Sequence, residues 1–155
     1  MNELITDLTS WNRILSYLLK MVVAFMLALP IAIDRERSTR IMGLRTFPLV
    51  AVASCGYLLI ALAFVGTNAD AKARVLQGLI TGIGFVGGGA ILKNEGVVKG
   101  TATAGSIWAT GAVGGSVAYG YADIALVISI VTFIVLRLFT PIKEAMNEKE
   151  EERPL

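Results

Sequence analysis

The sequence consists largely of apolar blocks that are each long enough to cross a lipid bilayer as a helix. Such a helix needs roughly 20 mostly apolar residues, and five segments meet this length approximately: 14–33, 47–65, 75–92, 101–118 and 123–139. The composition agrees, because 55% of the 155 residues are hydrophobic and only 17% are charged, whereas soluble domains carry about 25% charged residues. The sequence therefore predicts an all-α integral membrane protein with about five transmembrane helices.

The positive charges indicate how these helices are oriented. Segments 34–46, 93–100 and 143–155 lie on one side of a five-span arrangement and hold nine Lys and Arg residues, whereas the opposite segments hold Arg13, Lys72 and Arg74. Lys and Arg accumulate on the cytoplasmic side of membrane proteins, so we predict an outer N-terminus and a cytoplasmic C-terminus. We divide the chain into a transmembrane domain, residues 1–142, and a short charged cytoplasmic tail, residues 143–155.

Composition also argues against several functional classes. The net charge is only +2, which does not favour nucleic-acid binding. The chain has no His, the commonest general base and a common metal ligand. Its single cysteine, Cys55, lies in an apolar run. We therefore expect neither an enzyme nor a cofactor-binding protein, and the sequence leaves open whether a metal ion binds.

A glycine-rich block occupies the third predicted span. It comprises Gly78, Gly82, Gly84, Gly87, Gly88 and Gly89. Residues 82–87 match the G-x-G-x-x-G pattern, but a dinucleotide site would also need a preceding strand and an acidic residue about 20 positions later. The four-residue spacing of several glycines favours close helix packing instead. A second interpretation is an interrupted helix that lines a cavity, as in transporters.

The fourth predicted span is also rich in small residues, so we expect the third and fourth spans to pack against each other at short distance. Three of its polar or aromatic residues are candidates for function: Thr103, Ser106 and Trp108. Hydroxyl groups in lipid can satisfy backbone or cross-helix hydrogen bonds, and a buried indole N–H needs a partner. Core packing and ligand contact both remain open for these residues.

A charged loop follows the first span. Its candidate functional residues are Asp34, Arg35, Glu36, Arg37, Gly43, Arg45 and Thr46. The arginines are explained by the cytoplasmic placement of positive charge, but acidic residues contribute little to orientation. The two carboxylates would either pair locally with arginine or take part in a cation site or partner-binding surface.

Three stretches together resemble the MgtC/SapB family of bacterial inner-membrane proteins: residues 33–37 with 43–46, residues 81–89, and residues 98–108. The similarity extends over residues 19–143. The resemblance implies a multi-pass protein of the bacterial inner (plasma) membrane that is linked to growth at low magnesium and, in pathogens, to survival inside host cells. Many members carry a soluble C-terminal domain after the last span, so we expect this chain to be a short form.

Two functional hypotheses follow. In the first, the chain is a non-enzymatic regulator whose partners are the lipid bilayer and another membrane protein, for which the resemblance implies a membrane subunit of ATP synthase; a homo-oligomer is also compatible with the small-residue faces. In the second, it is a small carrier or channel for Mg²⁺ or another cation, with Asp34 and Glu36 at its inner mouth. Hard cations require oxygen ligands, and no carboxylate lies in the middle of any predicted span, which favours the regulator.

Overall fold

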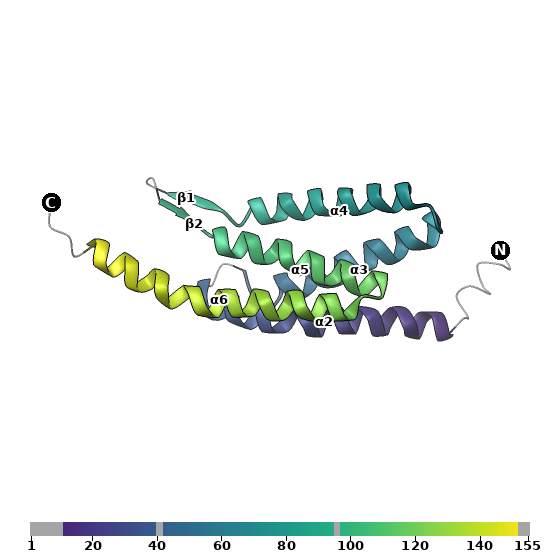
Figure 1. The fold of residues 1–155 in the computed structure, drawn as a ribbon, viewed down its shortest axis with the longest axis horizontal. Coiled ribbons are helices and arrows are strands. Elements are labelled where there is room, and N and C mark those ends of the chain that lie inside the picture. The colour runs from purple at the N-terminus through teal and green to yellow at the C-terminus, as the bar shows by residue number, and fades with distance from the viewer. Residues whose placement is uncertain (1–10, 40–41, 95–96, 152–155) are drawn as a thin grey trace.

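The computed structural model describes residues 11–39, 42–94 and 97–151. This part of the chain forms five helices and a short hairpin (Figure 1). The helices are α2 (Trp11–Thr39), α3 (Thr46–Val65), α4 (Ala69–Gly88), α5 (Thr101–Tyr119) and α6 (Ala122–Glu151), and the strands are β1 (Leu92–Asn94) and β2 (Val97–Lys99). The predicted helical fold class and the predicted number of helices are therefore confirmed.

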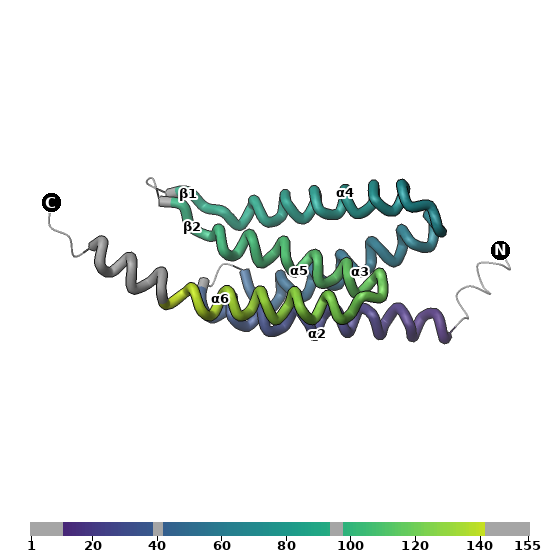
Figure 2. The backbone as a smooth tube through the Cα atoms, in the orientation of Figure 1, coloured from purple at the N-terminus to yellow at the C-terminus, as the bar shows by residue number. Residues whose placement is uncertain are grey.

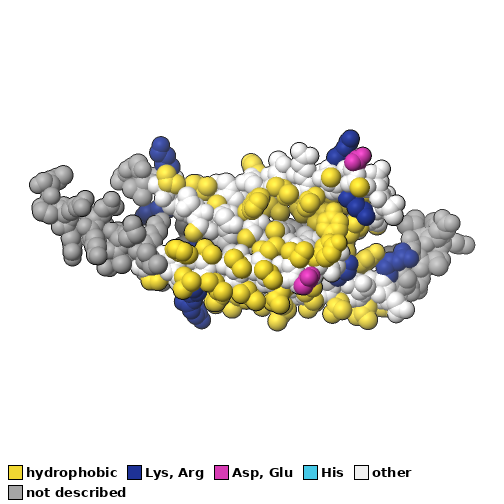
Figure 3. Space-filling view, viewed as in Figure 1, with side chains coloured by type: hydrophobic (Ala, Val, Ile, Leu, Met, Phe, Trp, Pro, Cys, Tyr) yellow, Lys and Arg dark blue, Asp and Glu magenta, His cyan; other side chains and the backbone are white. Residues whose placement is uncertain are grey.

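Three of the helices are long and apolar enough to cross a membrane: Trp11–Ser38, Thr46–Val65 and Ala122–Pro141. Helices α4 and α5 have 20 and 19 residues, which at a rise of 1.5 Å per residue gives each a length of about 30 Å, close to the hydrocarbon thickness of a bilayer. They are less apolar because α5 consists largely of Gly, Ala, Ser and Thr, whereas α4 carries several glycines and the charged residues Asp70, Lys72 and Arg74. The middle of the molecule shows mainly hydrophobic and uncharged surface, and many of its charges lie toward the two ends (Figure 3). The chain is a membrane protein.

Helix α4 begins six residues before the third span that the sequence predicts. The Asn68 side chain accepts a hydrogen bond from the Ala71 amide at 3.0 Å, which caps the helix start. The helix ends at Gly88, inside the glycine run, where the amides of Ala90 and Ile91 bond to carbonyls three residues back. The predicted span extends to residue 92, so its last residues belong to a turn and to β1 instead.

Helix α5 occupies the centre of the bundle and contacts the other four helices. In Figures 1 and 2, α4 forms an outer layer on one side of α5, and α2 and α6 lie on the other side. Ten residues of α5 are buried, compared with two of α4. The small residues of α5 thus allow four neighbours to approach one helix.

The closest approach of α5 is to α3, where a Cβ atom at Gly114 would collide with the Ala51 carbonyl group, 2.9 Å from its carbon. Helices α4 and α5 do pack against each other, as predicted for the third and fourth spans, but the glycines of α4 contribute little to this contact. Only Gly87 approaches α5, because its Cβ would lie 3.2 Å from the Ala104 carbonyl oxygen. A Cβ on any of four other α4 glycines would meet no atom within 4 Å: Gly78, Gly82, Gly84 and Gly88.

Side-chain hydrogen bonds also link helices of the bundle. Lys20 of α2 donates a hydrogen bond from Nζ to the Ala118 carbonyl at 2.9 Å, near the C-terminal end of α5, where a positive charge is favourable. Ser129 of α6 donates from Oγ to the Leu27 carbonyl of α2 at 2.6 Å. Both bonds join segments about 100 residues apart in the sequence.

Two features of secondary structure lie outside the simple helical prediction. The strands β1 and β2 pair antiparallel, with Leu92 opposite Lys99, in a segment that the sequence analysis assigned to the end of a span and to a loop. Gly100 follows with φ +88°, and a Cβ there would collide with the Ala90 carbonyl group, so glycine is required at this turn. Helix α6 continues past Pro141 to Glu151, so the domain boundary drawn at residue 142 falls inside a helix.

Candidate functional site

The charged residues at the end of α2 form a buried ion pair. Asp34 and Arg35 are 6% and 3% exposed. Arg35 donates to Asp34 Oδ2 from Nη2 at 2.6 Å and from Nε at 3.1 Å. A second guanidinium comes from α6, where Arg137 Nε lies 3.6 Å from Asp34 Oδ1. The Asp34 carboxylate therefore lies between two positive charges, which offsets the cost of burying it.

The second acidic residue of this segment is satisfied by the backbone. Glu36 Oε2 accepts a hydrogen bond from the Leu44 amide at 2.9 Å, so the loop folds back onto the last turns of α2. Gly43 lies against Glu36, and a Cβ at position 43 would be 2.8 Å from the Glu36 Cα. Local pairing with arginine, one of the two interpretations of this loop, thus describes Asp34, whereas Glu36 pairs with a main-chain N–H.

The remaining loop candidates take no part in these bonds. Arg37 is exposed on α2. Arg45 occupies the residue before α3 and makes no side-chain cap bond, and Thr46 begins that helix and is partly buried. The structure therefore brings together Asp34, Arg35, Glu36 and Gly43 but not all seven predicted residues.

Arg137 belongs to this cluster and was missed by the sequence analysis, which described the fifth span only as apolar. A signal was present, because Arg137 is the only charged residue between Asp123 and Lys143. A lone charge near the end of an otherwise apolar span usually has a partner in the bundle. Here that partner is Asp34.

A hollow of about 420 Å³ opens beside the ion pair, between α2 and α6. Most of its lining is apolar, and its charged groups come from both helices: the residues are Met26, Leu29, Pro30, Ile33, Asp34, Arg37, Phe133 and Arg137. The Arg137 guanidinium also lies over the Phe133 ring, 6.0 Å from the ring centroid.

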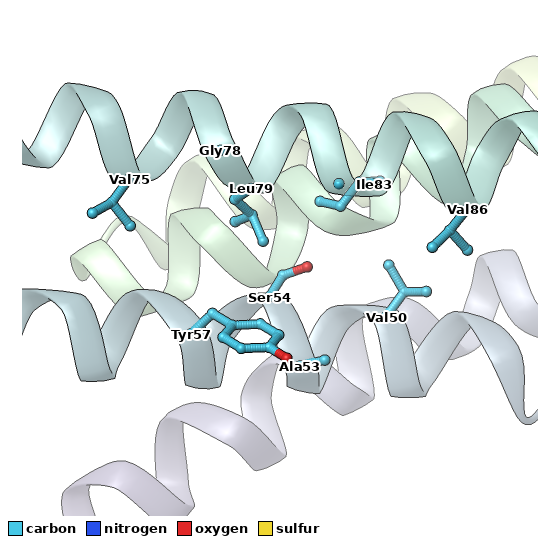
Figure 4. A pocket seen from close by; sticks show the side chains of 10 residues that line it. Val50, Ala53, Ser54, Tyr57, Val75, Gly78, Leu79, Ile83 and Val86 are labelled. Carbon is cyan, nitrogen blue, oxygen red and sulfur yellow. The ribbon is translucent and has the colours of Figure 1, made fainter.

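A larger groove, about 470 Å³ in volume, separates α3 from α4. Figure 4 shows Val75, Leu79 and Val86 of α4 extending toward the side of α3 that carries Val50 and Ser54. The groove is lined almost wholly by apolar and small residues: Val50, Ala53, Ser54, Tyr57, Val75, Gly78, Leu79, Gly82, Ile83 and Val86. Two glycines of the predicted packing face thus border an open groove.

The three candidates of the fourth span have different environments. Thr103 and Ser106 are buried, and Ser106 Oγ donates to the Ala102 carbonyl at 2.6 Å, as core packing predicts. The Thr103 Oγ1 atom has no hydrogen-bond partner in the described part of the chain. Trp108 is 54% exposed and borders a second hollow, about 280 Å³, between α4 and α5. Core packing within the chain is therefore wrong for Trp108.

Among the described residues, no group of three or more Cys, Asp or Glu side chains could hold a metal ion. The arrangement at the end of α2 can bind an anion through its guanidinium groups, and the α3–α4 groove can receive an apolar chain or helix.

Comparison with known proteins identifies the family. Residues 21–145 match the model of the MgtC family. The chain belongs to the MgtC family. The matched range includes all five helices in whole or in large part, together with the ion pair and the α3–α4 groove. No solved structure matches the chain.

Three curated relatives illustrate the range of similarity to other members of the MgtC family. A protein of Synechocystis sp. is 33% identical over 140 residues, which is 90% of this chain and 57% of the relative. Protein SrpB of Synechococcus elongatus is 30% identical over 132 residues, 77% of this chain and 72% of SrpB. Protein MgtC of Salmonella typhimurium is 28% identical over 132 residues, 85% of this chain and 56% of that protein. The chain thus spans little more than half the length of two of these relatives.

Proposed function

We propose that this MgtC-family chain is a multi-pass protein of the bacterial inner membrane that regulates another membrane protein and catalyses no reaction itself. The proposal of regulation rests on one structural observation, the open groove between α3 and α4. Family membership and the apolar surface support the membrane location.

The proposed orientation places the end of the bundle that carries the ion pair in the cytoplasm. The C-terminal ends of α2 and α6, the N-terminal ends of α3 and α5, and the hairpin all lie at this end of the bundle (Figure 1). Arg137 adds one more positive charge to the nine counted from the sequence. Such an accumulation of Lys and Arg is typical of cytoplasmic surfaces.

The groove has the properties of a surface that receives a transmembrane helix. Gly78 and Gly82 lie four residues apart at its border and leave the α4 backbone open to close approach, as in small-residue helix pairs. The α4 residues that line it extend from Val75 to Val86, a length of about 16 Å along the helix axis. A partner helix could therefore contact about three turns of α4.

The family resemblance supplies the candidate partner, a membrane subunit of ATP synthase, and the link to magnesium homeostasis. The matched region covers 56% of the Salmonella typhimurium MgtC protein, so a function shared with that whole protein is a proposal for this chain. We infer that the helix bundle in the membrane is sufficient to regulate this partner.

The rival function, transport of Mg²⁺ or another cation, requires free oxygen ligands. The two carboxylates proposed for an inner mouth are both engaged, Asp34 by two arginines and Glu36 by the Leu44 amide. Mg²⁺ flux into proteoliposomes with an internal Mg²⁺ dye tests the rival directly. Flux that Glu36→Ala abolishes would replace the regulator proposal with a carrier, whereas the proposal expects no flux above that of empty liposomes.

Photo-crosslinking tests occupancy of the groove by a partner helix. A photoreactive phenylalanine analogue replaces Tyr57, which is 66% exposed and lines the groove. We expect irradiated cells to yield an adduct with an ATP synthase membrane subunit. The Gly78→Leu/Gly82→Leu variant should lose most of this adduct, because the leucine side chains fill the groove. A probe at Phe139, which is exposed on α6 and lies outside the groove, should give little of this adduct.

Gly84→Leu is the matched control, because Gly84 is on the same helix, is equally open and does not line the groove. It should leave the adduct unchanged. An adduct of twice the chain mass at Tyr57 would instead assign the groove to a second copy. Equal loss of the adduct in both variants would also contradict the proposal.

A further inference from the structure

The hollow between α2 and α6 combines unbalanced positive charge with an apolar wall. Two arginines, Arg37 and Arg137, line this hollow beside a single carboxylate, that of Asp34. Asp34 and Arg35 neutralise each other at 2.6 Å. The excess charge therefore belongs to Arg37 and Arg137, both of which line the hollow.

These two arginines are available to a ligand. The Arg137 side chain is 59% exposed, and within the described residues its guanidinium forms an ion pair with Asp34 and lies over the Phe133 ring. Arg37 is exposed, and no acidic side chain of the described chain pairs with it. Guanidinium groups bind phosphate strongly because they donate two parallel hydrogen bonds to its oxygens.

The rest of the hollow is suited to hydrocarbon. Its remaining lining residues are Met26, Leu29, Pro30, Ile33 and Phe133. Those on α2 precede the ion pair, so this wall extends from the charged end toward the middle of the apolar stretch Trp11–Ser38. A ligand that fills the hollow must therefore be charged at one end and apolar along its length.

We propose that this hollow is a binding site for an anionic phospholipid of the cytoplasmic leaflet. The phosphate lies between Arg37 of α2 and Arg137 of α6, and an acyl chain follows the apolar wall. Basic pockets between transmembrane helices on the cytoplasmic side commonly bind such headgroups. The site rests on the proposed orientation but not on the regulatory partner, so it can be tested without that partner.

A fluorescent reporter placed in the hollow tests the proposal. Phe133→Trp puts an indole in the lining, while Trp11→Phe and Trp108→Phe remove the two native indoles. The full chain is reconstituted in phosphatidylcholine vesicles, and brominated phosphatidylglycerol or brominated phosphatidylcholine with the same chains is added as quencher. We expect phosphatidylglycerol to quench at several-fold lower mole fraction than phosphatidylcholine. Arg37→Gln and Arg137→Gln should each reduce this preference by about fivefold.

Arg74→Gln is the control, because Arg74 is exposed near the other end of the bundle, and it should leave the preference unchanged. The Arg37→Gln variant should still fold, because Arg37 takes no part in the buried ion pair. A loss of lipid preference in this variant is therefore not explained by misfolding. An absent preference would overturn the proposal, as would an equal loss in the Arg74→Gln variant. Displacement of the lipid by inorganic phosphate, compared with chloride at the same ionic strength, would assign the site to a free anion and also overturn it.

Discussion

Helices α4 and α5 are nearly equal in length and similarly rich in small residues, yet they use these residues differently. In α5 three of the four glycines lie against neighbouring helices, as where Gly114 meets the Ala51 backbone. In α4, glycines such as Gly82 face open space. Small residues therefore permit close approach without requiring it, and a glycine-rich helix can remain open for a partner that the chain does not contain.

The largest expected effect is the difference in folded yield between a leucine substitution in α5 and one in α4. Gly114→Leu should abolish most of the folded yield, because the new side chain collides with rigid backbone; overpacking costs typically about 1–3 kcal/mol and occasionally more, and we expect a value above this range. Size-exclusion chromatography of the purified protein in mild detergent measures the yield. Gly84→Leu should retain wild-type yield, and an equal loss in both variants would break the comparison.

A smaller effect tests the contact between α4 and α5. A Cβ at Gly111 would overlap the end of the Ile83 side chain and lie 3.1 Å from its Cγ1. Gly111→Ala should lower the free energy of unfolding by about 1–2 kcal/mol, because this flexible side chain can partly yield. The change should appear as a lower thermal midpoint. Ile83→Val removes the Cδ1 atom, so the double variant should recover much of the loss; no recovery would show that another contact limits the packing.

A gain in stability is expected on the open side of α4. Gly84→Ala introduces a methyl group that meets nothing, and alanine is favoured over glycine in a helix by about 1 kcal/mol. The midpoint of unfolding in a detergent titration should rise accordingly. At Gly87, where a Cβ would lie 3.2 Å from the Ala104 carbonyl oxygen, the same substitution should gain less or lose stability. Equal gains at both positions would mean that α4 does not approach α5 there.

The smallest effect concerns a hydroxyl group in α5. Thr103→Val removes a buried Oγ1 that has no partner within the described chain, so stability should be unchanged or rise by up to about 1 kcal/mol. Thr110→Val is the comparison, because Thr110 donates to the Ser106 carbonyl of the same helix at 2.8 Å, and it should lose about 0.5–1 kcal/mol. A clear loss for Thr103→Val would indicate a partner from outside the chain.

The sequence predicts the helices well because long apolar runs are a local signal. It does not predict how α4 and α5 differ, because that difference depends on which residues face a neighbour, and both helices contain similar residues. The pairing of Asp34 with Arg137 joins positions more than 100 residues apart, and no local pattern links them. The β1–β2 hairpin is also unpredicted, since strands of three residues show too little alternation to be recognised.

The candidate site is therefore only partly predictable. Four residues of the charged segment at the end of α2 do lie together, namely Asp34, Arg35, Glu36 and Gly43. The hollow that Arg37 lines depends on the position of α6 beside α2, which no local pattern indicates. The glycine block was identified from its spacing, but most of its glycines do not face α5, the helix with which they were predicted to pack. The functional role of these residues remains a prediction.

The bond between Lys20 and the Ala118 carbonyl also bears on how the protein is assembled. The two residues are 98 positions apart, and synthesis proceeds at about 5–20 residues per second. The first helix therefore reaches the membrane about 5–20 s before its acceptor has been made. During this interval the ammonium group must remain near the aqueous boundary, since burial of an unpaired charge is costly. We expect α2 to enter the bilayer incompletely at first and to take its final depth only when α5 arrives, so that the order of synthesis is also an order of insertion.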